Sequence, residues 1–148
     1  MTMKIAFGAD HAGYEGDTPY KPALVEHIEA LGHTVVDRGT NGPGSADYPV
    51  YAHAVAEAVA KGEADRGILL CGTGVGMAMA ANKHAGVRAA TCTSPEMAKL
   101  SREHNDANVL SLGSRLNSLD ECMAIVDAWL ATPFTGEERH RRRIAQIG

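Results

Sequence analysis

The sequence has few cysteines and lacks the motifs that cysteine and histidine form around metals. Its three cysteines, Cys71, Cys92 and Cys122, are an odd number at wide spacing, which does not suit a disulfide framework. Neither a Cys-x-x-Cys nor a His-Glu-x-x-His pattern occurs, and the seven histidines follow no metal-ligand spacing. We therefore expect a protein of a reducing compartment, the cytoplasm, with no bound metal.

Long hydrophobic runs and a strong excess of one charge are also missing. No apolar stretch approaches the roughly 18 residues of a membrane-spanning helix, and the apolar residues 3–8 are too few for a signal peptide. With 14 Lys and Arg against 18 Asp and Glu, the net charge of −4 gives no general attraction to nucleic acid or to a membrane surface. We expect neither among the partners.

What remains is the composition of an ordinary globular domain, with 45% apolar and 22% charged residues. A chain of 148 residues suits a single domain, here residues 1–148. Five short apolar segments alternate with segments of helical periodicity. The predicted strands cover residues 4–8, 34–37, 68–70, 87–92 and 108–112.

Short, fully apolar strands that alternate with helices are typical of a parallel sheet covered on both faces. Right-handed crossovers then predict an α/β fold with a doubly wound, five-stranded parallel sheet, most simply in the order 2-1-3-4-5. The basic segment after Gly136 predicts a C-terminal helical tail. In such sheets a ligand binds at the carboxyl ends of the strands, near the switch point between strands one and three.

The third strand runs into the most informative stretch, Cys71-Gly72-Thr73-Gly74-Val75-Gly76. Its three glycines let backbone amides approach a ligand closely, and the helix that follows points its positive end at the same place. Cys71 is the last side chain before the turn, where nearby N–H dipoles favour the thiolate. The pattern indicates a reactive thiolate beside an anion cradle, although a cysteine at a strand end also occurs simply as a small buried apolar residue.

Three well-known phosphate motifs do not fit this stretch. Met77 stands where a dinucleotide-binding G-x-G-x-x-G needs its third glycine, and that motif belongs after the first strand. The Gly-Lys-Ser/Thr of a Walker loop is absent. A cysteine phosphatase needs an arginine about six residues after the thiol, where Met77 again stands.

Other polar residues follow strands one, two and five and therefore meet Cys71 at the same edge of the sheet. These residues are Asp10, His11, Tyr48 and Arg115. His104 and Asn105 instead precede strand five and belong at the opposite edge. They either end a helix, where a histidine suits the negative end of the dipole, or they complete the pocket of a second subunit, which requires a dimer.

Arg139 and Arg143 lie four residues apart, on one face of the predicted tail helix. Together with Arg115 they can hold a phosphate dianion through charge-assisted hydrogen bonds. Basic C-terminal helices are also common as solvated surfaces. Nucleic-acid binding by the tail is a further alternative, one that the net charge of −4 supports poorly.

Six segments, taken in order over nearly the whole chain, resemble the type B ribose-5-phosphate isomerases, a family that includes galactose-6-phosphate and allose-6-phosphate isomerases. The segments are Gly8 to Gly13, Asp47-Tyr48-Pro49, Cys71 to Gly76, Ala81-Asn82-Lys83, Arg102 to Val109 and Gly113-Ser114-Arg115. The resemblance implies a cofactor-free aldose–ketose isomerase that interconverts ribose 5-phosphate and ribulose 5-phosphate through an enediolate.

The resemblance also implies a role for each matching residue. Cys71 matches the base that takes the C2 proton, Thr73 a hydroxyl that helps protons move between oxygens, and His104, with Asn105 beside it, the residue that opens the furanose ring. The substrate-binding matches are Asp10, His11 and Tyr48 for the sugar, the amides of Gly72, Gly74, Val75 and Gly76 for the enediolate oxygen, and Arg115, Arg139 and Arg143 for the phosphate.

One segment departs from the family pattern. Residues 15–22 are several residues longer than the family's direct run from strand one into helix one, and they lie beside Asp10 and His11. An isomerase of a six-carbon sugar phosphate, allose or galactose 6-phosphate, therefore stays open, as does a non-catalytic module that binds a phosphorylated ligand. We expect a homodimer with shared active sites; the sequence does not distinguish it from a tetramer.

Overall fold

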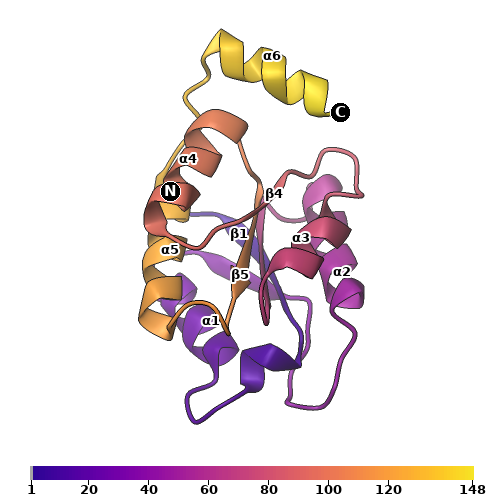
Figure 1. Cartoon of the computed structure of the whole chain (residues 1–148), viewed down its shortest axis with the longest axis vertical. Helices are drawn as coiled ribbons and strands as arrows, with labels where there is room; N and C mark the ends of the chain where they lie inside the picture. The colour runs from indigo at the N-terminus through magenta and orange to yellow at the C-terminus, as the bar shows by residue number, and fades with distance from the viewer. Residues whose placement is uncertain (1) are drawn as a thin grey trace.

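The structure, a computed structural model, describes residues 2–148 as a parallel β-sheet between two layers of helices (Figure 1). The elements are β1 (Lys4–Ala9), the 3-10 helix η1 (His11–Tyr14), α1 (Tyr20–Ala30), β2 (Thr34–Asp37), α2 (Tyr48–Ala60), β3 (Arg66–Cys71), α3 (Val75–Ala81), β4 (Ala89–Thr91), α4 (Pro95–Asn105), β5 (Val109–Gly113), α5 (Leu119–Ala131) and α6 (Glu138–Ile147). All the strand pairs are parallel. The predicted α/β class is confirmed, and the basic tail forms α6.

The strands lie in the order β2-β1-β3-β5-β4, so the predicted order 2-1-3-4-5 is wrong at one edge of the sheet. β5 lies inside the sheet and pairs with both β3 and β4. Every residue of β5 is buried, whereas the three residues of β4 are each partly exposed. An inner strand is covered on both faces and along both edges, which suits the fully buried β5. The short, partly exposed β4 suits the edge of the sheet.

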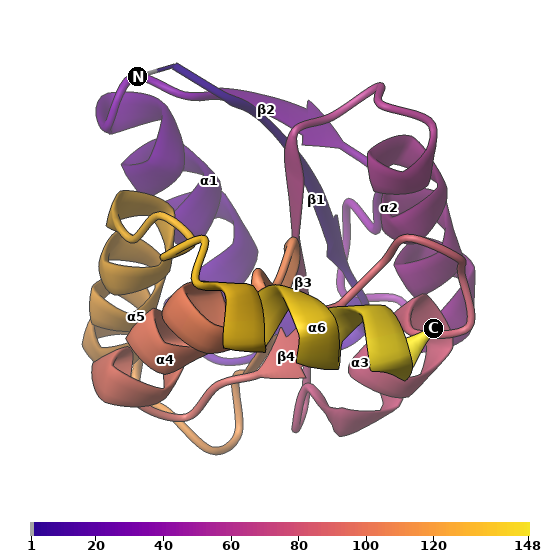
Figure 2. The same ribbon diagram turned by 90° about the horizontal axis from the view of Figure 1, so that it is seen from above.

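The helices divide between the two faces of the sheet. Figure 2 shows α1, α4 and α5 on one face and α2 and α3 on the other. Successive residues of β3 point to opposite faces, so Ile68 and Leu70 pack under the first layer while Leu69 and Cys71 pack under the second. Cys71 therefore ends its strand on the side of α2 and α3.

The two ends of the sheet carry different segments. The turns that follow β1, β3 and β5 lie at the carboxyl ends of the strands, together with η1, whereas α6 lies beyond the opposite end (Figure 1). Because β1 has β2 on one side and β3 on the other, the switch point lies where the sequence analysis expected it. Within residues 2–148 no helix is long and apolar enough to cross a membrane.

Candidate active site

The glycine-rich stretch forms the turn between β3 and α3. Cys71 is the last residue of β3 and is 6% exposed, and the backbone N–H of Gly74 donates to its Sγ at 3.0 Å. Gly74 has a φ of 79°, a left-handed conformation that glycine adopts without a steric cost. The turn therefore directs a backbone donor at the sulfur, as the sequence pattern predicted.

Two neighbouring strands hold this turn in place through the carbonyl of Gly74. Ser111, fully buried in β5, donates its hydroxyl to that oxygen at 2.6 Å, and Thr91 of β4 donates at 3.3 Å. Ser111 was not among the residues predicted from the sequence. The available signal was a hydroxyl within an otherwise apolar inner strand, because such a group needs a buried partner.

The end of β5 packs directly against the same turn. A Cβ atom placed on Gly113 would lie 2.7 Å from the backbone carbonyl group of Thr73, so only glycine permits this approach. The N–H groups of Ser114 and Arg115 donate to the carbonyl oxygens of Cys71 and Gly72, each at 2.9 Å. Cys71 and Arg115 therefore sit on two segments that are hydrogen-bonded to each other.

Arg115 lies over Gly72, because a Cβ on that glycine would be 3.1 Å from Nη1 of the arginine. Its Nε donates to Oε2 of Glu15 at 3.2 Å and its Nη2 donates to Oε1 at 2.5 Å. This hydrogen-bonded ion pair raises the pKa of Arg115 and lowers the pKa of Glu15, and nearby Asp10 and Cys71 also raise that of Arg115. Glu15 is a second residue that the sequence analysis did not place in the site.

Asp10 and His11 follow β1 and border the turn from the other side. Asp10 is 7% exposed, its Oδ1 accepts from the N–H of Ala12 at 2.9 Å, and its own N–H donates to the carbonyl of Leu70 at 3.1 Å. His11 accepts from the N–H of Ala46 through Nδ1 at 3.1 Å. The bond from Ala12 to Asp10 caps η1, and the bond from Ala46 to His11 joins η1 to the loop before α2.

Tyr48 and Thr73 complete the residues at this end of the sheet. The ring of Tyr48, the first residue of α2, lies so close to Gly76 that a Cβ there would be 2.5 Å from its Cε1. Thr73 is exposed, and its Oγ1 accepts from the N–H of Val75 at 3.2 Å. The N–H groups of Gly74 and Val75 are thus already bonded within the turn.

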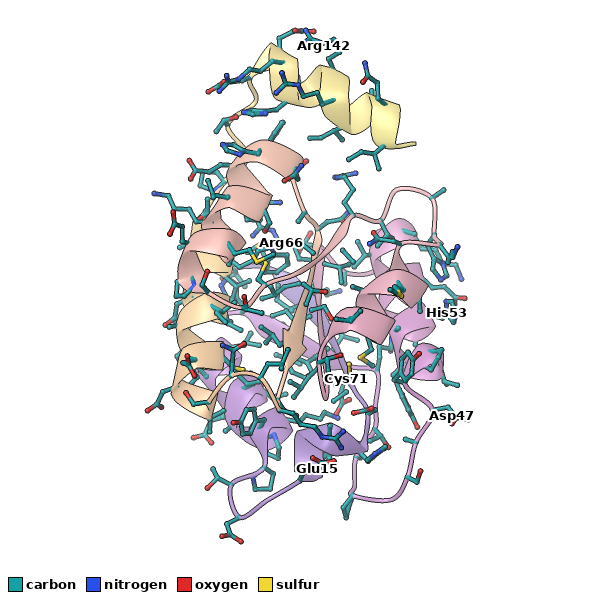
Figure 3. All side chains as sticks on the ribbon, in the orientation of Figure 1. Glu15, Asp47, His53, Arg66, Cys71 and Arg142 are labelled. Atoms are coloured by element: carbon teal, nitrogen blue, oxygen red, sulfur yellow. The ribbon has the colours of Figure 1, made fainter. Side chains whose placement is uncertain are left out.

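Four of the predicted site residues lie at the opposite end of the molecule, at the end of α4 and on α6. They are His104, Asn105, Arg139 and Arg143. The His104 ring stacks on that of His140, with centroids 4.6 Å apart, and Arg139 donates to Glu137 at 3.0 Å. Figure 3 shows Cys71 near one end of the strands and Arg142 of α6 beyond the other. Within one chain these residues do not meet Cys71.

The opposite end also carries a cavity, and exposed apolar side chains flank the sheet edge formed by β4. A cavity of about 640 Å³ lies between α6 and the sheet, lined among others by His84, Arg88, Asn105 and Ile147. Exposed apolar residues lie on both sides of the edge strand β4, on α3 and on α4. They are Val75 and Met79, and Met97 and Leu100. Within residues 2–148 no three His, Cys, Asp or Glu side chains form a metal-binding group.

Comparison with known proteins gives consistent matches over nearly the whole chain. The family model Ribose/Galactose Isomerase matches residues 5–147. The chain is 51% identical over 144 residues to ribose-5-phosphate isomerase B of Escherichia coli, covering 97% of this chain and 93% of that protein. It is 40% identical over 143 residues to ribose-5-phosphate isomerase B of Mycobacterium tuberculosis, covering 96% and 86%.

Solved structures agree with the sequence matches. A ribose-5-phosphate isomerase B of Clostridium thermocellum superposes with a TM-score of 0.93 at 50% identity, covering 99% of this chain and 95% of that one. A type B ribose 5-phosphate isomerase of Trypanosoma brucei has a TM-score of 0.93 at 44% identity, covering 99% and 97%.

Proposed function

The chain belongs to the ribose/galactose isomerase family, among its type B ribose-5-phosphate isomerases, and on that premise we propose that it interconverts ribose 5-phosphate and ribulose 5-phosphate through an enediolate. The observation that carries the proposal is the Sγ of Cys71, which ends β3, accepts the N–H of Gly74 in the glycine turn, and is followed by Gly72, over which the Arg115 guanidinium lies. Residues 1–148 act as one domain and need no cofactor.

Cys71 is the base in this proposal. Its thiolate takes the proton from C2 of the open-chain aldose, the electron pair moves onto the carbonyl oxygen as an enediolate, and the proton returns at C1 to give the ketose. The hydroxyl of Thr73 helps the accompanying proton pass between the oxygens at C1 and C2. The exposed position of Thr73 on the same turn as Cys71 supports this assignment.

The backbone amides of the turn stabilise the negative oxygen of the enediolate. A donor aimed at a developing oxyanion contributes about 3 kcal/mol in comparable sites. Among Gly72, Gly74, Val75 and Gly76, the N–H of Gly74 already donates to the sulfur and that of Val75 to Thr73. These two donors change partner as charge moves from the sulfur to the substrate oxygen.

Substrate binding uses groups on both sides of the turn. Asp10, His11 and Tyr48 hold the sugar hydroxyls and ring, and their convergence around the turn supports this role. Arg115 binds the phosphate, at a distance from the reacting carbons, so that binding energy there orients C1 and C2 toward Cys71.

The other predicted residues reach the site from a second subunit. His104, which opens the furanose ring, Asn105 beside it, and the phosphate-binding Arg139 and Arg143 lie at the far end of their own chain, so a homodimer with shared active sites brings them to Cys71. The exposed apolar side chains beside the edge strand β4 support such pairing. A tetramer built from two such dimers has the same pockets.

A six-carbon sugar phosphate is the second candidate substrate, because Glu15, in the longer loop between η1 and α1, reaches Arg115 and so changes the phosphate end of the pocket. The test compares kcat/KM for ribose 5-phosphate, allose 6-phosphate and galactose 6-phosphate. The proposal predicts the highest value for ribose 5-phosphate. A higher value for either six-carbon substrate would replace the pentose assignment, and turnover of none of them would leave only a binding module.

A further inference from the structure

Both carboxylate oxygens of Glu15 contact the Nε–Nη2 edge of Arg115, the guanidinium assigned above to the substrate phosphate. Figure 3 places the label of Glu15 below that of Cys71, at the carboxyl end of the sheet. We infer that Glu15 competes with the phosphate group of the sugar phosphate for Arg115, and so sets the affinity of the enzyme for phosphorylated ligands. This inference rests on the proposed role of Arg115.

The geometry of the pair makes Glu15 a stand-in for the phosphate. A guanidinium binds a carboxylate or a phosphate through the same fork of two parallel N–H donors, so the two anions exclude each other along one edge. The other edge of the Arg115 guanidinium is confined, since Nη1 lies against Gly72. A phosphate therefore gains the Nε–Nη2 edge only when Glu15 leaves it.

Exposure makes the competition reversible. The Arg115 side chain is 59% exposed and that of Glu15 is 42% exposed, so water screens the pair and readily solvates the released carboxylate. A phosphate dianion carries twice the charge of the carboxylate and interacts more strongly with the same cation. Glu15 thus weakens phosphate binding without preventing it.

Asp17 provides a matched control in the same loop. It is exposed like Glu15, and within residues 2–148 it forms no ion pair. Removing either charge changes the net charge of the loop by the same amount, but only Glu15 occupies Arg115. A difference between Glu15→Gln and Asp17→Asn therefore reports the local contact rather than the general field of the loop.

The alternative role for Glu15 predicts the opposite change in KM. If Glu15 held Arg115 in the orientation that phosphate needs, its loss would raise KM. If Glu15 competes, its loss lowers KM. Because the Glu15 and Asp17 side chains are exposed and the loop backbone is unchanged, neither Glu15→Gln nor Asp17→Asn should disturb the fold. An unchanged thermal midpoint would verify this.

The experiment measures KM and kcat for ribose 5-phosphate, and the Kd of inorganic phosphate by calorimetry, at one fixed ionic strength. Glu15→Gln should lower both KM and the phosphate Kd about two- to fivefold, as expected for loss of an exposed ion pair. The kcat should not change, and Asp17→Asn should leave all three values as they are. An unchanged or raised phosphate Kd in Glu15→Gln would overturn the inference, as would an equal effect of Asp17→Asn.

An Arg115→Ala variant separates this inference from the proposed function. If Arg115→Ala leaves the KM and the phosphate Kd at the wild-type values, the assignment of Arg115 fails, and the inference with it. If Arg115→Ala weakens phosphate binding, the assignment stands, and adding Glu15→Gln to it should cause no further change because the shared partner is gone. An additional effect of Glu15→Gln in that background would contradict competition at Arg115.

Discussion

Gly113→Ala should disturb the active site from within the sheet. The new Cβ would lie 2.7 Å from the carbonyl carbon and oxygen of Thr73, and backbone atoms cannot rotate away as a side chain can. The turn after Cys71 must recede by roughly 0.7 Å to restore ordinary contact. Overpacking of this kind costs about 1–3 kcal/mol.

The same displacement should lower activity more than stability alone explains. It moves the Gly74 N–H that lies 3.0 Å from the sulfur and shifts Cys71 relative to Arg115. Since a misplacement of about 1 Å costs on the order of 100-fold in rate, kcat/KM should fall roughly 10- to 100-fold.

Urea unfolding at a fixed protein concentration measures the stability change, and steady-state kinetics measures kcat/KM. Gly44→Ala is the matched control, because a Cβ there meets nothing within 4 Å, and its free energy of unfolding should stay within about 0.5 kcal/mol of wild type. Wild-type kcat/KM in a folded Gly113→Ala variant would refute the claim that close packing of β5 against the turn positions the thiol.

Three further predictions concern the turn, a buried thiol and the proposed dimer. Ser111→Ala removes the 2.6 Å hydrogen bond to the Gly74 carbonyl, which still accepts from Ala78 N–H and the Thr91 hydroxyl. The free energy of unfolding, measured by urea titration, should therefore fall by about 1 kcal/mol. No loss would show that this bond is dispensable. Burial raises the pKa of the Cys122 thiol from 9.0 to about 11. Because the unfolded chain loses this proton at a lower pH than the folded chain, the free energy of unfolding should fall as pH rises from 9 to 11. Cys122→Ala should reduce this dependence on pH, and an unchanged dependence would contradict its assignment to Cys122. Cys71→Ala and His104→Ala subunits should each be inactive alone, and mixing them should restore about a quarter of the wild-type activity if each pocket is shared. No recovery in a demonstrated heterodimer would exclude sharing.

Much of the site could be predicted from the sequence because parallel strands bring their carboxyl ends to one edge. That rule alone placed Asp10, Cys71 and Arg115 together and put His104 at the opposite edge, and the structure has them so. The glycine turn was predictable for a related reason. Gly74 is left-handed and Gly76 faces the ring of Tyr48, so both positions depend on the missing Cβ.

The order of β4 and β5 was harder to predict, because both segments are short and apolar and consecutive strands usually pair. The difference lies in coverage, since β5 is buried at every position and β4 at none. Pairs distant in sequence were also out of reach. Glu15 and Arg115 are 100 residues apart, and nothing in either local sequence indicates the contact.

We propose that the Sγ of Cys71 removes the C2 proton of the sugar phosphate. The most direct test follows solvent deuterium into C2 of ribose 5-phosphate with Cys71→Ala, in a sample whose circular dichroism and oligomeric state match wild type. Both turnover and deuterium incorporation should be lost in this variant. Deuterium incorporation at the wild-type rate would show that another group is the base.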